Sequence, residues 1–62
     1  MKKKGSINEP EFEELVQNLS SLWKNGNILL FANTILIINK IYTSKILESL
    51  LLETKKRIDT KE

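Results

Sequence analysis

The sequence predicts an all-α protein, organised as a helical hairpin of one short and one long helix. Three observations favour this fold. Apolar residues in the first half recur at steps of three and four, which is the period of a helix that buries one face. An Asn-Gly-Asn segment then interrupts the pattern, and helical spacing resumes over residues 28–57. The chain has 62 residues, two Gly, one Pro and no Cys, so it is a single domain without a disulfide framework.

The short helix is expected at residues 9–24. Asn8 is suited to cap its N-terminus, and Pro10 falls in the first turn, where a missing N–H costs nothing. Glu11 is placed to complete a capping box. The apolar residues that follow share one face, and they are Phe12, Leu15, Val16, Leu19, Leu22 and Trp23. Gly26 is expected to end the helix as a left-handed C-cap.

The long helix is expected at residues 28–57. The many Ile residues favour a strand by local propensity, whereas the apolar spacing favours a helix. The alternative is a break near residue 43, which folds a third helix back and gives a monomeric three-helix bundle. No Gly or Pro marks such a break, and this favours the continuous helix.

The unequal lengths of the two helices predict a homodimer. A helix rises about 1.5 Å per residue, so the short helix covers only the first half of the long one. A second copy would cover the apolar overhang in a four-helix bundle. The residues expected to form this self-association surface are Ile35, Ile38, Asn39, Tyr42, Ile46, Leu47 and Leu50. Asn39 either fixes the register of the pairing or lies exposed beside a kink. If the overhang is not the interface, the apolar excess of residues 28–41 is the contact surface.

Three segments are expected along the chain: a mobile basic arm at residues 1–7, a helical domain at 8–58 and a frayed tail at 59–62. No apolar segment follows the basic start, which argues against secretion, and no apolar run reaches the roughly 20 residues of a membrane span. The absence of Cys is compatible with the cytosol, so a cytoplasmic location is expected.

The residue types argue against catalysis. Without Cys or His there is no thiol nucleophile, imidazole base or Cys/His zinc site. The sequence has no Gly-rich phosphate loop, and the Glu residues at the start of the first helix are explained by the helix dipole. We therefore expect no enzyme, and no catalytic, cofactor-binding or metal-binding residues.

The leading functional hypothesis is a small non-enzymatic interaction protein, an adaptor or regulator that acts as a helical homo-oligomer. Trp23, beside the turn, is either an anchor for a protein partner or a plug for the hairpin core. One alternative is a nucleic-acid-binding regulator, although a net charge of +2 does not require a polyanionic partner. Its candidate contacts are Lys2, Lys3, Lys4, Lys55, Lys56 and Arg57. The other alternative is a peripheral membrane protein that uses the apolar breadth of residues 28–41.

Overall fold

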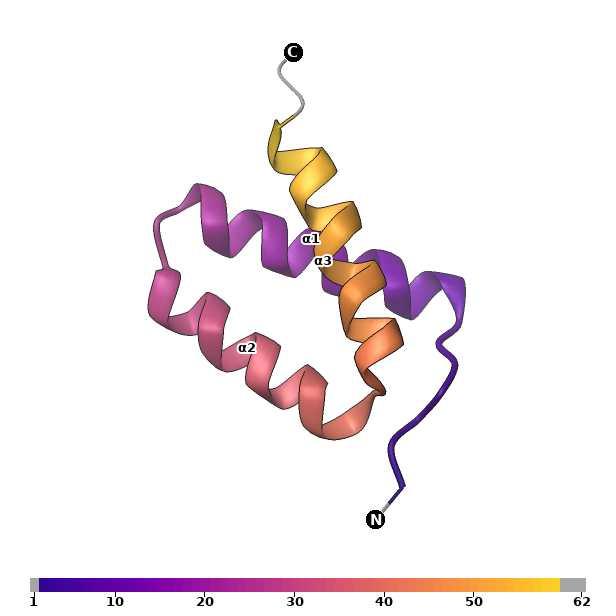
Figure 1. The fold of residues 1–62 in the computed structure, drawn as a ribbon. Coiled ribbons are helices and arrows are strands. Elements are labelled where there is room, and N and C mark those ends of the chain that lie inside the picture. The colour runs from indigo at the N-terminus through magenta and orange to yellow at the C-terminus, as the bar shows by residue number, and fades with distance from the viewer. Residues whose placement is uncertain (1, 60–62) are drawn as a thin grey trace.

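The computed structural model describes residues 2–59, which fold into three α-helices and no strand (Figure 1). The helices are α1 (Glu9–Lys24), α2 (Ile28–Ile41) and α3 (Ser44–Asp59). The all-α prediction is confirmed, and the three-helix arrangement is the one that forms. The continuous helix over residues 28–57 is wrong, because the chain turns between α2 and α3.

Asn8 and Gly26 cap the two ends of α1 as the sequence predicted, whereas the capping box with Glu11 stays a prediction, because the Glu11 carboxylate accepts from the Tyr42 hydroxyl. The Asn8 side chain accepts a hydrogen bond from the backbone N–H of Glu11 at 3.2 Å. At the other end Gly26 has a φ of 79°, which only glycine adopts without strain. The N–H of Asn27 donates to the Leu22 carbonyl and the N–H of Gly26 to the Trp23 carbonyl, the paired bonds of a Schellman motif.

The break between α2 and α3 falls at Tyr42, which has extended backbone angles. Residue Lys4 of the N-terminal arm occupies the gap in the helical hydrogen bonding. Its N–H donates to the Ile41 carbonyl at 2.7 Å, and its carbonyl accepts from the Thr43 N–H at 2.9 Å. The Tyr42 hydroxyl donates to the Glu11 carboxylate at 2.5 Å. An aromatic and a β-branched residue suit extended backbone, so the break needs neither Gly nor Pro.

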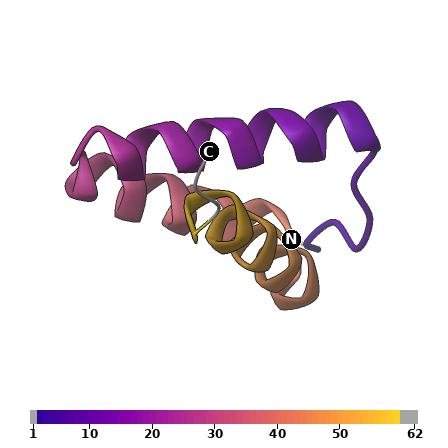
Figure 2. The same cartoon turned by 90° about the horizontal axis from the view of Figure 1, so that it is seen from above.

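The three helices form two layers. Figure 2 shows α1 on one side of the molecule and α2 and α3 together on the other. The α1–α3 contact is the most extensive of the three, and Figure 1 shows α3 crossing α1 rather than running along it. The buried apolar core comprises Val16, Leu19, Ile38, Tyr42 and Leu50. Each helix contributes to it, and Tyr42 contributes from the α2–α3 junction.

The arm before α1 makes contacts that its composition did not indicate. In addition to the backbone bonds of Lys4, the side chain of Ile7 packs against the core. The mobility of residues 1–7 stays a prediction, although Lys4 and Ile7 contact the rest of the chain. At the other end α3 extends to Asp59, and the rest of the predicted tail at 59–62 lies outside the described residues.

Candidate functional site

The most unusual surface of the molecule is the outward side of α2. We define the α2 face as the large apolar residues of this helix that remain exposed: Ile28, Leu29, Leu30, Leu36, Ile37 and Ile41. Leu29 is 78% exposed and Leu36 is 58% exposed. The opposite side of the same helix, with Phe31, Ile35 and Ile38, packs in the core. The helix therefore contacts its own chain on one side only, although both sides are apolar.

The α2 face is as large as the largest apolar patches found on monomeric proteins. It exposes on the order of 600 Å², at the upper end of the roughly 300–600 Å² typical of the largest apolar patch on a monomer. Among residues 2–59, by contrast, only five apolar side chains are buried. The only charged residue in α2 is Lys40, in its last turn. A helix surface with so little charge is poorly suited to remain in contact with water. An apolar partner surface would explain why these side chains are exposed in a single copy.

Trp23 stands at the turn between α1 and α2. Its ring meets the ring of Phe31 edge to face, with centroids 5.2 Å apart. This contact closes the end of the α1–α2 pair, as expected for a plug of the core. The side chain is still 45% exposed, so it also offers an aromatic surface to a partner.

The structure places the predicted self-association residues inside a single copy. Ile38, Tyr42 and Leu50 are buried in the core. Ile35, Ile46 and Leu47 are half-buried against the same core, and Asn39 is half-buried. No overhang exists in this fold, because α3 turns back across α1. The surface left open is the alternative one, residues 28–41, and its signal in the sequence was an apolar surface broader than one stripe.

The two basic clusters do not gather within one copy. Figure 1 shows the N-terminal arm and the C-terminal end of α3 at opposite ends of the molecule. Arg57 forms a bidentate ion pair with the Glu13 carboxylate, with N–O distances of 2.7 and 2.8 Å. Its Nε also donates a hydrogen bond to the Glu53 carboxylate at 3.4 Å. The ion pair lowers the pKa of Glu13 and raises that of Arg57. It joins the start of α1 to the end of α3.

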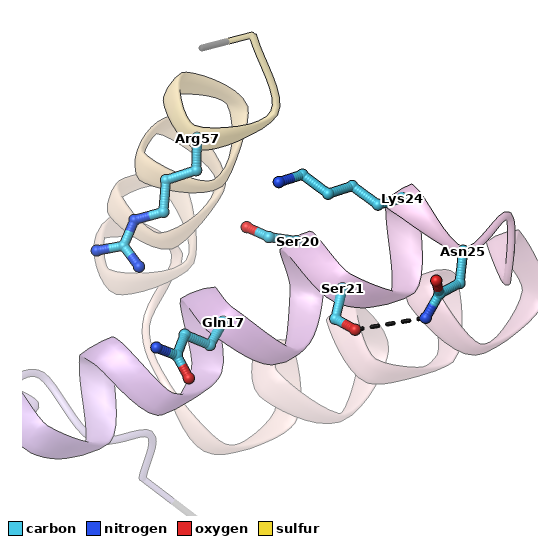
Figure 3. Close-up of a pocket in the computed structure, with 6 residues that line it drawn as sticks. All are labelled: Gln17, Ser20, Ser21, Lys24, Asn25 and Arg57. Carbon is cyan, nitrogen blue, oxygen red and sulfur yellow. Dashed lines mark hydrogen bonds between the residues drawn. The ribbon is translucent and has the colours of Figure 1, made fainter. Parts of the chain in front are cut away.

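An open depression of about 440 Å³ lies between α1 and α3 (Figure 3). The residues around it are of polar types and comprise Gln17, Ser20, Ser21, Lys24, Asn25 and Arg57. The Ser20 hydroxyl is buried there without a hydrogen-bond partner in the described chain, and Asn25 donates weakly to Ser21 at 3.5 Å. A serine with no imidazole or carboxylate base beside it is not an activated nucleophile. Neither an imidazole nor a carboxylate is among the residues that line the depression.

Two other kinds of site are absent from the part of the chain that the structure describes. Residues 2–59 contain no group of three or more metal-ligating side chains. None of the three helices there combines the length and the apolar content that a bilayer span requires.

Comparisons with protein-family models, with curated proteins and with solved structures each found no match to this chain. The fold and the site define only a class of protein, a small three-helix protein in which α2 packs against its own chain on one side and is exposed on the other. Its function must be inferred from that geometry.

Proposed function

We propose that this protein is a small non-enzymatic interaction protein, an adaptor or regulator that acts as a helical homo-oligomer through the α2 face. One observation carries the proposal: α2 is apolar on both sides and is covered on one. The interface thus differs from the predicted overhang at residues 46–50, whose apolar side chains are supplied with partners by the chain itself.

A second copy is the occupant that the dimensions favour. A stable protein–protein interface buries about 800 Å² on each partner. The α2 face provides most of that area, and the exposed part of Trp23 adds to it. Chains of about 60 residues bury too little surface to be robust alone, and association is a common remedy. Covering Leu29, Leu30, Leu36 and Ile37 would add four large apolar side chains to the five that the core now buries among the described residues.

The alternatives draw less support from the same geometry. For nucleic-acid binding, the N-terminal arm and the C-terminal end of α3 lie at opposite ends of the molecule (Figure 1), and Arg57 is paired with Glu13, so the two basic clusters do not combine within one copy. For binding at a membrane surface, an interfacial helix normally has a basic polar side, whereas α2 has Lys40 alone. A cytoplasmic location remains part of the proposal.

Sedimentation equilibrium tests the proposal directly. We expect a mass of at least twice 7.2 kDa at micromolar concentrations, and a melting temperature that rises with protein concentration. A monomeric mass at every concentration would refute homo-oligomerisation. In that case co-sedimentation with anionic vesicles would support the membrane alternative. A gel shift that weakens steeply with salt would support the nucleic-acid alternative.

A further inference from the structure

We infer that two copies pair through α2 in an antiparallel, two-fold arrangement, with Asn33 of each copy beside the axis. This inference rests on the proposed function and specifies its geometry. Four exposed residues of α2 carry it, because they share the outward side of the helix: Leu29, Asn33, Leu36 and Lys40.

These four residues follow the spacing of a helix–helix seam. Their steps are four, three and four, the spacing of alternate positions in a heptad. Leu30 and Ile37 flank the seam on one side, and both are about half exposed. The core-facing residues Phe31, Ile35 and Ile38 lie on the opposite side. The exposed side of α2 thus has the pattern of a short seam for a second helix, two heptads long.

The position of Lys40 selects the antiparallel orientation. In a parallel pair the two Lys40 side chains would face each other within the apolar seam. In an antiparallel pair centred between Thr34 and Ile35, each Lys40 lies opposite Leu29 of the second copy. The two lysines are then about 16 Å apart along the helices at about 1.5 Å per residue. That separation exceeds the screening length of about 8 Å at physiological ionic strength.

Asn33 is the only other strongly polar residue of the seam. With the axis between Thr34 and Ile35, the two Asn33 residues are offset by about 4.5 Å along the helices. A carboxamide both donates and accepts, so the two side chains can satisfy each other. In this register each Asn33 lies opposite Leu36 of the second copy and diagonal to the other Asn33. A shift of one helical turn in one direction would separate the two amides by about 10 Å along the helices, which is costly in an apolar interface. A shift in the other direction would keep the amides together but would leave one turn at an end of each α2 without a facing helix. Asn33, together with the full overlap of the two α2 helices, therefore selects this register, a role that the sequence suggested for Asn39.

Disulfide trapping distinguishes this arrangement from its competitors, because the natural chain contains no Cys. We expect Asn33→Cys to form a disulfide-linked dimer under mild oxidation, since facing helices 8–10 Å apart bring its two Cα atoms to about 6 Å. Leu29→Cys alone should not cross-link, but a mixture of Leu29→Cys and Lys40→Cys should. All three positions are exposed, so circular dichroism should show the helicity of the natural protein.

The outcomes separate this inference from the proposed function. Self-cross-linking of Leu29→Cys, with or without that of Asn33→Cys, would indicate a parallel pair and overturn the inference, while homo-oligomerisation would stand. A dimer in which no single or mixed variant cross-links would place the interface away from the α2 face. A monomeric mass for all variants and for the natural protein would overturn both.

Discussion

Replacing Leu36 with alanine should weaken the association of two copies without unfolding either. Leu36 is 58% exposed in a single copy and lies at the centre of the proposed seam. Full burial of a leucine side chain is worth about 1.5–3 kcal/mol, so covering this exposed part contributes roughly 1–1.7 kcal/mol. A two-fold dimer contains the residue twice, which gives about 2–3.5 kcal/mol per dimer. At 1.4 kcal/mol for each tenfold change, the dissociation constant should rise about 30- to 300-fold.

Leu52→Ala is the matched control. Leu52 is a leucine of α3 with 60% exposure, so the same atoms are removed from an equally exposed site outside the α2 face. The dissociation constants of both variants and the natural protein are measured by sedimentation equilibrium, and their helicity by circular dichroism. If Leu36→Ala and Leu52→Ala dissociate equally, the α2 face is not the interface and the reasoning fails.

Three further predictions concern the fold. Leu50→Ala should destabilise the fold itself by about 2–5 kcal/mol in urea unfolding, because Leu50 is fully buried within one copy. Lys4→Pro should lower the melting temperature, since it removes the N–H that bonds Ile41, whereas Lys4→Ala keeps that bond and should change it little. The pKa of Glu13 is depressed by Arg57, so its contribution is present above the ordinary value of 4.5 and lost as pH falls through the folded pKa. Acid titration should therefore destabilise the natural protein more than Glu13→Gln; equal slopes would contradict an effect of the ion pair.

Local signals in the sequence predicted much of the fold. The limits of α1 follow from Asn8, Pro10 and Gly26, because capping depends on a few neighbouring backbone groups. The half-buried or buried state of Phe12, Val16 and Leu19 follows from helical spacing. These features need no knowledge of distant parts of the chain.

The sequence allowed a break near residue 43 as an alternative, but it did not favour that break over a continuous helix. Its stabilising contacts come from Lys4 and Glu11, which are more than 30 residues away in the chain. The Tyr42 hydroxyl bond raises the pKa of the phenol and keeps it protonated as a donor. No local property of residues 41–44 reveals that an arm and a carboxylate will meet there. The apolar spacing and the lack of Gly or Pro near residue 43 therefore favoured a continuous helix.

That one break decides which apolar surface is available to a partner. With a continuous helix, Leu47 and Leu50 would project beyond α1 and need a second copy. With the break, α3 crosses α1 and these residues join the core, so the self-association surface inferred from the overhang is filled by the chain itself. The chain nevertheless has more apolar helix than three short helices can cover, because α2 is apolar on both sides. The uncovered apolar surface therefore lies on α2, in the middle of the chain, and not at the end of a long helix. A second copy is still expected, but with different contact residues.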